Sequence, residues 1–423
     1  MYNTLKRRLK HIKHRFLSIA GIKTKGNPTH TIGQNMELAE AKFDSFMQYP
    51  KSSTKERIKK LDESKKRNIV YIYDQLDFST FRYRALNLLE IYQKYFTNIT
   101  PHVFFLNEIS ELYNYIRKID LIILVRTSWT VDLESLIFEF KKLGKKIIYD
   151  IDDLIISEEH IRNIVKNDYQ AKDNNHISIL FGVAMRKIWL MRLADYFISP
   201  NEYLSSKIQS SYQKPTYLIY NSLNSTQVEY SDYILKQEEK KSSKTKYLAY
   251  FSGSSSHNAD FASIKQVLLR ILKERANVHL LIGGFLELDE SFNEFSDRII
   301  RLPFTNFVSQ LEYINQCYIN LIPLEDNEFN DCKSELKYFE SAILKKPSIA
   351  SPRYPFRKIK ERNPNNILLS HSKTDWYQNI KLLLDNEEAY SRISNQARED
   401  AINTYYDKNI YSQLKIVLDS VLE

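Results

Sequence analysis

Glycine is scarce in this sequence, with only 8 glycines among 423 residues. No stretch matches the G-x-x-x-x-G-K-[ST] pattern of a P-loop or the three glycines of G-x-G-x-x-G. Both patterns depend on glycine because backbone N–H groups must approach phosphates closely. The sequence therefore supports neither a P-loop ATPase nor a dinucleotide-binding enzyme.

Cysteines and long apolar runs are also few. The two cysteines, Cys317 and Cys332, lack the spacing of a metal site, so we expect free thiols in a reducing compartment. No run approaches the ~20 apolar residues of a membrane-spanning helix, and no signal-peptide core follows the basic start. These absences predict a cytoplasmic protein without a metal site.

Basic residues, in contrast, are abundant, and the formal net charge is +9. In residues 1–20, Leu5, Leu9, Ile12 and Phe16 recur at helical spacing among lysines and arginines. This pattern is typical of an amphipathic helix on an anionic membrane surface; a helix packed on the protein or a solvated tail is the alternative. Because no nucleic-acid reader motif is present, we expect no nucleic-acid partner.

Strand-like and helix-like segments alternate twice along the chain, on either side of a charged stretch. A chain of this length exceeds one compact core, and βα alternation favours parallel sheets covered by helices. We therefore predict an α/β protein with two doubly wound domains facing a cleft. The expected parts are a basic helical extension (1–66), a first Rossmann-like domain (67–228), a linker (229–245), a second domain (246–404) and a C-terminal helix (405–423).

The segment from Leu321 to Pro352 has the strongest pattern of residues in the second domain. It reads as strand, polar loop, amphipathic helix and strand, which places the loop at the carboxyl edge of a sheet, where ligands of α/β proteins bind. Lys333, Lys337 and Glu340 share one helical face. We predict Lys333 at the helix N-terminus as a contact for a diphosphate; a solvated charged face is the alternative.

A loop of small residues opens the second domain, directly after a predicted strand at 247–251. Ser252, Gly253 and Ser254 let backbone N–H groups approach an anion. His257 follows, either as a contact to a bound phosphate or as a residue of the helix cap. This loop is the second predicted part of an anion site.

Polar residues also follow the predicted strands of the first domain; they are Ser79, Arg82, Arg84, Arg126, Asp150, Asp152 and Asp153. The arginines suit an anionic ligand such as a phosphate, with surface arginines as the alternative. The clustered carboxylates suit acid–base chemistry, with helix N-capping as the alternative.

Several of these runs resemble one known family. FNDCKSELKYFESA followed by KPSIASP is similar to the nucleotide-sugar segment of GT-B glycosyltransferases, nearest to the family 4 group that builds bacterial surface polysaccharides. STFRYR, LGKKIIYDIDDLI and FSGSSSHNADF resemble other motifs of that group in the same order. Glu340 matches the second Glu of the group's E-x7-E motif, while Cys332 stands where the first Glu is expected.

The resemblance implies a metal-independent, retaining hexosyltransferase with the GT-B fold and a C-terminal helix that crosses back to the first domain. Its donor is a nucleotide-diphosphate sugar, with no other cofactor, and its acceptor a glycan or lipid-linked molecule in capsule or cell-envelope synthesis. This places the enzyme in the cytoplasm, peripherally on the inner face of the membrane. The implied donor-binding residues are Ser252, Gly253, Ser254, His257, Lys333, Ser334, Glu335 and Glu340.

Roles follow from the same resemblance. Glu340 is expected to contact the donor's ribose hydroxyls, and Asp150 to stand near the acceptor hydroxyl; with Lys333 they are the predicted catalytic residues. The acceptor side comprises Ser79, Arg82, Arg84, Arg126, Asp152 and Asp153. Two alternatives stay open: a GT-B nucleotide-sugar epimerase, and an inactive glycosyltransferase-like partner, which the cysteine at position 332 suggests.

Overall fold

The computed structural model describes residues 29–77, 80–161, 174–238, 245–253 and 258–422. The chain divides into two compact units, Met1–Leu38 and Ala39–Glu423. Helix α2 (Thr29–Phe46) runs across that division. All that follows concerns the second unit.

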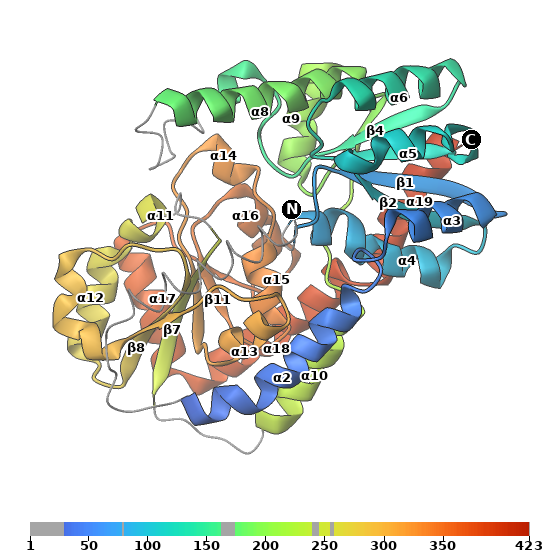
Figure 1. Ribbon diagram of the computed structural model, residues 1–423. Coiled ribbons are helices and arrows are strands. Elements are labelled where there is room, and N and C mark those ends of the chain that lie inside the picture. Colours follow the sequence, from blue (N-terminus) through green and yellow to red (C-terminus); the bar gives the residue numbers. More distant parts are fainter. Residues whose placement is uncertain (1–28, 78–79, 162–173, 239–244, 254–257, 423) are drawn as a thin grey trace. The chain divides into compact units, whose positions relative to one another are not determined.

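The first half of this unit is built on a six-stranded sheet of parallel strands in the order β2-β1-β3-β4-β5-β6 (Figure 1). The strands are β1 (Arg67–Tyr73), β2 (Ile99–Phe105), β3 (Leu121–Val125), β4 (Lys146–Asp150), β5 (Tyr196–Ser199) and β6 (Thr216–Leu218). All five residues of β3 are buried, as expected for a strand covered on both faces.

Helices cover both faces of the first sheet. Its helices are α3 (Thr54–Glu63), α4 (Asn87–Tyr95), α5 (Ile109–Tyr113), α6 (Val131–Lys142), α8 (Asn174–Leu193) and α9 (Glu202–Tyr212). Along β1, Tyr71 joins an apolar cluster with α4, whereas Val70 joins another with α3, α5 and α6. Successive side chains of a strand point to opposite faces, so the two clusters lie on opposite sides of the sheet.

Local chemistry sets the ends of α6. The Thr130 side chain accepts a hydrogen bond from the Leu133 backbone N–H at 3.2 Å, which caps the first turn. Gly144 follows the helix with a φ of +75°, a conformation that glycine adopts without a Cβ penalty. These two residues therefore set where α6 begins and ends.

The second half contains another parallel six-stranded sheet, in the order β12-β11-β10-β7-β8-β9. Its strands are β7 (Lys246–Ser252), β8 (Val278–Gly284), β9 (Ile299–Leu302), β10 (Ile319–Ile322), β11 (Ser348–Ala350) and β12 (Leu368–Leu369). Strand order reverses between β7 and β10, which makes this point the topological switch where ligands of such sheets bind.

Helices also cover the second sheet on both faces (Figure 1). They are α11 (Asn258–Ala262), α12 (Lys265–Glu274), α13 (Ser309–Asn315), α14 (Glu328–Asp331), α15 (Leu336–Ala342), α16 (Tyr354–Arg362), α17 (Lys373–Asp385) and α18 (Glu387–Tyr405). The predicted α/β architecture of two doubly wound, Rossmann-like halves is confirmed.

The C-terminal helix α19 (Lys408–Leu422) packs on the first half. The Tyr411 ring stacks on Tyr95 of α4 with centroids 4.5 Å apart. The Gln413 side chain accepts a hydrogen bond from the Tyr220 backbone N–H at 3.0 Å, just after β6. The predicted return of the last helix to the first domain is therefore confirmed.

In the stretch expected to link the halves, residues 229–238 are helical. Helix α10 covers Ser225–Glu238, and its Tyr230 hydroxyl donates to the Glu312 carboxylate of the second half at 2.7 Å. Charged residues alone do not reveal such a helix, because its anchoring Tyr230 finds a buried partner only in the folded chain. None of the described helices combines the length and apolar character needed to cross a membrane.

Candidate functional site

Residues that follow the strands of one sheet contact residues that follow the strands of the other. The Asn201 side chain, just after β5, donates to the backbone oxygens of Lys333 at 2.8 Å and Asp331 at 3.1 Å. Asn221, after β6, donates to the Ser334 hydroxyl at 2.8 Å. The predicted donor segment is thus held against the carboxyl edge of the first sheet.

Glu340 is the centre of a second contact between the halves. Its carboxylate oxygen Oε1 accepts hydrogen bonds from Arg82 Nη2 at 3.2 Å and from the Tyr83 hydroxyl. The Arg82 guanidinium lies 3.8 Å from the Tyr83 ring centroid and 4.3 Å from that of Phe307. Both ends of the contact are buried, since Arg82 is 4% and Glu340 9% exposed. The alternatives of a solvated Glu340 face and a surface Arg82 are therefore wrong.

Burial keeps Tyr83 a hydrogen-bond donor. Desolvation raises the pKa of the Tyr83 hydroxyl well above its ordinary value, although the positive charge of Arg82 acts in the opposite direction. The phenol is then protonated at neutral pH and donates to the Glu340 carboxylate. Glu340, which was predicted to bind the donor ribose, therefore accepts hydrogen bonds from side chains of the first half in this structure.

A third contact is a network of charges at the ends of β3 and β4. Arg126 Nη1 pairs with Asp152 at 2.9 Å and its Nη2 with Asp153 at 2.9 Å. Lys333 Nζ reaches Asp153 from the second half at 3.1 Å. Although burial opposes it, Lys333 and then Arg126 lower the pKa of Asp153. The two carboxylates pair with Arg126 rather than capping a helix, and Asp153 joins the halves.

Arg126 holds this network with an unusual backbone conformation. Its φ is +49°, in the left-handed region that residues other than glycine seldom adopt. Backbone strain of this kind persists where the surroundings over-determine a residue, often at functional sites. The geometry therefore singles out Arg126 among the predicted acceptor-side residues.

Asp150 and Arg84, both predicted at the acceptor, form a separate buried ion pair. Arg84 Nε and Nη2 bond the two carboxylate oxygens of Asp150 at 2.8 and 2.9 Å, and both side chains are 0% exposed. Burial raises the pKa of Asp150 to about 6, against the influence of Arg84, so the carboxylate is mostly ionised at pH 7. In this structure the Asp150 carboxylate has no surface accessible to an acceptor hydroxyl, and its charge is compensated by Arg84.

The donor segment also differs from the prediction in detail. Helix α15 begins at Leu336, so Lys333 lies before the helix rather than on its first turn. Cys332 is 1% exposed and packs in the apolar cluster of the first half. Burial raises the pKa of its thiol to about 12. Cys332, at the position where the resemblance implies a Glu, is therefore a neutral packing residue.

The two acidic residues nearest to Cys332, Asp331 and Glu335, are also engaged in the fold. The Asp331 carboxylate accepts the Tyr354 backbone N–H at 2.6 Å, at the start of α16. Glu335 is 3% exposed, and its Oε2 has no hydrogen-bond partner among the described residues. Desolvation raises the pKa of Glu335 to about 8. At neutral pH Glu335 is therefore largely a protonated acid.

Replacing Glu335 with glutamine is expected to make stability less dependent on pH. The pKa of Glu335 is raised in the folded chain, so its contribution is complete below pH 4.5 and is lost as pH rises through about 8. Each pH unit in this window costs the wild type roughly 1.4 kcal/mol of unfolding free energy. Urea denaturation at pH 5 and pH 8 measures the difference. Glu361→Gln, at an exposed residue, is the control and should behave as the wild type does. If the unfolding free energy changed equally between pH 5 and pH 8 in the wild type and in Glu335→Gln, the expectation would be contradicted.

The small-residue loop lies at the end of β7. Ser252 is the last residue of that strand and is 4% exposed, whereas Gly253 after it is exposed. A Cβ on Gly284 would lie 1.9 Å from the Ser252 carbonyl oxygen, so β8 approaches this loop closely because Gly284 has no side chain. The predicted contacts Ser79, Ser254 and His257 lie outside the described residues.

Sequence reasoning missed several members of this site. Tyr83, Asn201 and Asn221 contact the donor segment, and no local pattern distinguishes them from ordinary polar residues. Lys337 was recognised only as part of a charged face, yet its Nζ is buried with no hydrogen bond within the described part of the chain. The spacing of Lys337 and Glu340 on one helix face was the feature of the sequence that could have indicated a role for Lys337.

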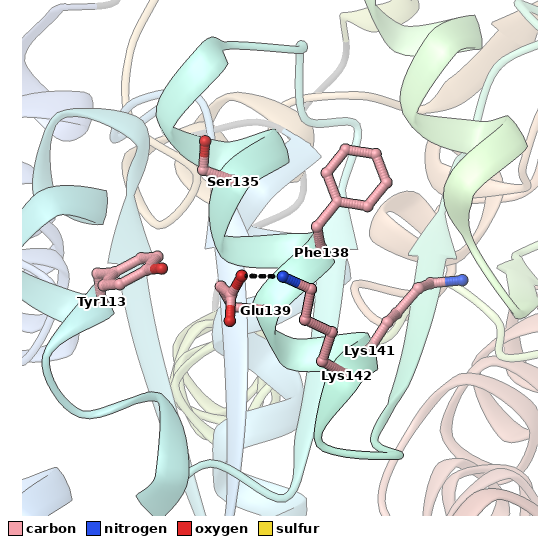
Figure 2. A pocket seen from close by; sticks show the side chains of 6 residues that line it. All are labelled: Tyr113, Ser135, Phe138, Glu139, Lys141 and Lys142. Atoms are coloured by element: carbon pink, nitrogen blue, oxygen red, sulfur yellow. Dashed lines mark hydrogen bonds and ion pairs between the residues drawn. The ribbon is translucent and has the colours of Figure 1, made fainter.

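A surface hollow of about 750 Å³ lies away from these contacts, lined by Tyr113, Ser135, Phe138, Glu139, Lys141 and Lys142 (Figure 2). Lys142 and Glu139 pair across it at 2.6 Å. None of the predicted site residues lines this hollow, so we assign it no part in the site. Within the described ranges, His, Cys, Asp and Glu side chains form no group of three or more suited to a metal ion.

Solved structures share this arrangement of two sheets. Anabaena HepE, determined with UDP and glucose, has 14% identity and a TM-score of 0.57 over 84% of this chain and 100% of HepE. A Rickettsia africae glycosyltransferase has 13% identity and a TM-score of 0.58, covering 85% of this chain and 100% of its own. This chain has the GT-B fold. Sucrose-phosphate synthase of Thermosynechococcus elongatus is similar as well, with 12% identity and a TM-score of 0.55 over 84% of this chain and 99% of that one.

The sequence itself matches no protein-family model and no curated protein. At 12–14% identity the likeness to the solved GT-B structures concerns the fold. Function is a property of sites placed on a fold. The argument for an activity therefore depends on the residues at the two facing edges of this GT-B chain.

Proposed function

We propose that this protein is a glycosyltransferase that moves a sugar from a nucleotide-diphosphate donor to a glycan or lipid-linked acceptor. The observation that carries the proposal is Glu340, which matches a donor-binding motif and lies buried against Arg82 and Tyr83 of the opposite half. A carboxylate at this point accepts hydrogen bonds well, which suits the hydroxyls of a ribose. Family resemblance adds retention of configuration and independence of metals to the proposal.

The donor would lie along the carboxyl edge of the second sheet. Its diphosphate would meet the end of β7 at Ser252 and Gly253 and the cations of the donor segment. Fixed cations and N–H groups at that point stabilise the negative charge that develops on a departing diphosphate. In this structure the Glu340 carboxylate accepts hydrogen bonds from Arg82 and Tyr83. On donor binding, the ribose hydroxyls would replace these donors at Glu340.

Two exposed aromatic rings suit the nucleobase. Phe285 follows β8 and Phe304 follows β9, and their centroids lie 6.2 Å apart. Phe304 is 69% exposed, which leaves ring surface available for stacking. We assign the base to Phe304, beside Phe285 at this edge of the second sheet.

The acceptor would approach from the first half, near Arg126 and Asp152. These residues keep partial exposure, with side chains 20% and 12% accessible. Arg126 supplies a cation for an anionic acceptor, and Asp152 and Asp153 supply carboxylates for its hydroxyls. Asp150 is excluded from this role because it is completely buried.

A screen of nucleotides and nucleotide sugars by thermal shift tests the proposal. A ligand that binds only the folded state raises Tm by mass action. We expect one nucleoside diphosphate and its sugar conjugate to raise Tm, and turnover to require an added acceptor. Conversion of the donor to an epimer without acceptor would favour the epimerase. Tight binding without any turnover would favour an inactive partner, and no binding at all would overturn the proposal.

Deleting residues 1–20 is expected to release the protein from anionic vesicles while leaving transfer to a soluble acceptor intact. The segment lies outside the described residues, and the proposal of membrane contact comes from its basic amphipathic pattern. Sedimentation with phosphatidylserine vesicles, compared with phosphatidylcholine vesicles, measures the effect. Unchanged binding of the shortened protein to anionic vesicles would show that this segment is not the anchor.

A further inference from the structure

Lys337 carries an ammonium group that the fold buries without a hydrogen bond. Its Nζ has no hydrogen-bond partner among the described residues. It lies 4.7 Å from the centroid of the Tyr250 ring, a contact with the face of an aromatic ring. A buried cation costs free energy unless an anion compensates it. The group is therefore prepared for a negative charge that the protein does not fully supply.

The position of Lys337 in the fold is equally specific. Tyr250 belongs to β7, and Asn320 of β10 donates its side-chain N–H to the Lys337 carbonyl oxygen at 2.8 Å. Strand order reverses between β7 and β10. The switch point of an open α/β sheet is where its ligand binds, outside the carboxyl ends of the strands. Lys337 thus lies at the binding edge of the second sheet.

Among the described residues, one nearby carboxylate, that of Asp260, offsets part of the Lys337 charge. The Asp260 carboxylate raises the pKa of Lys337, but burial outweighs it and lowers that pKa to about 8. One oxygen of Asp260 already accepts the Glu325 backbone N–H at 2.7 Å. Lys333, the lysine that the sequence favoured for a diphosphate, instead pairs with Asp153 of the first half at 3.1 Å.

We propose that Lys337 binds the diphosphate of the nucleotide donor, while Lys333 joins the two halves through Asp153. This inference rests on the proposed function and identifies the cation at its centre. On binding, a diphosphate oxygen accepts a charge-assisted hydrogen bond from the Lys337 ammonium. Burial of the lysine beforehand makes that contact stronger than one made in water.

Affinities for diphosphates and for nucleosides separate this role from a structural one. The probes are UDP, GDP, ADP and dTDP, each beside its nucleoside, titrated calorimetrically into the full-length protein. Lys337→Met is expected to lower the affinity for the diphosphate that the wild type binds by at least ~10-fold, the scale of one charge-assisted contact. Its affinity for the matching nucleoside should stay within about threefold, because the base and ribose contacts are unchanged. Lys337→Arg keeps the cation and should retain most of the diphosphate affinity.

Lys381→Met is the matched control, since Lys381 is an exposed lysine on α17 of the same half. If Lys337→Met fails to fold, Lys337→Gln takes its place in the titration. Equal diphosphate affinity in wild type and variant would overturn the assignment, as would a loss confined to Lys333→Met. A wild type that binds none of the four diphosphates would overturn the proposed function itself, a result distinct from either.

Discussion

Replacing Asp150 with alanine is expected to lower the free energy of unfolding by about 3–5 kcal/mol. The guanidinium of Arg84 is completely buried, and Asp150 is its counter-ion. Arg84 Nη1 also donates to the Ile219 carbonyl oxygen at 2.6 Å and to Asn221 at 3.1 Å. These neutral acceptors cannot replace the lost charge, so the variant leaves a buried cation uncompensated. Urea denaturation at pH 7 measures the loss.

Asp62→Ala is the appropriate control for this experiment. Asp62 also pairs with a basic residue, Lys118, at 3.2 Å, but both side chains are about half exposed. A pair in water contributes ~0–1 kcal/mol. The double variant Arg84→Met with Asp150→Ala should recover part of the stability, because both buried charges are then gone. An Asp150→Ala protein of normal stability that had lost transfer activity would instead restore the catalytic role that sequence reasoning gave it.

Replacing Glu340 with alanine is expected to weaken nucleoside-diphosphate binding by about 10- to 100-fold, the range for a lost hydrogen bond to a charged group. The proposed contact joins its carboxylate to the ribose hydroxyls, so the ribose loses an ionised acceptor. Calorimetric titration with UDP, GDP, ADP and dTDP measures the change. Glu361→Ala, at an exposed glutamate paired with Lys358 on α16, should bind as the wild type does.

Glu340 also has a structural role that the experiment must separate. Without its carboxylate, the buried Arg82 loses its ion-pair partner, and its Nε and Nη1 already have no hydrogen bond among the described residues. The variant is therefore expected to unfold more easily as well. The double variant Arg82→Met with Glu340→Ala removes this unpaired cation while leaving the ribose contact absent. Restored stability with weak binding supports the proposed contact, whereas full nucleotide affinity in either variant contradicts it.

Much of the fold could be predicted because its determinants are local. The buried strand β3 is a continuous apolar run, and α6 is set by its capping Thr130 and the glycine at position 144. Periodicity and turn chemistry act over a few residues. Alternation of such strands and helices then leaves few architectures, of which the doubly wound sheet is one.

The chemistry of individual site residues could be predicted only in part. Glu340 and the lysines before it were recognisable from their spacing, but their partners were not. Arg82 pairs with Glu340 across 258 positions and Lys333 with Asp153 across 180. Helical and strand periodicity relate only residues a few positions apart. Periodicity therefore could not predict whether these side chains are solvated or form buried contacts.

The sequence by itself determined the two parallel sheets and the polar residues that follow each strand, since these depend on short-range patterns of burial and turn formation; the return of the C-terminal helix was implied only by the family resemblance. Only the tertiary structure decided which of those polar residues are internal. It buried Asp150 with Arg84, paired Lys333 with Asp153 and left Lys337 without a hydrogen bond to any residue that the structure describes. The physical reason is that desolvation and ion pairing depend on what surrounds a charge in space.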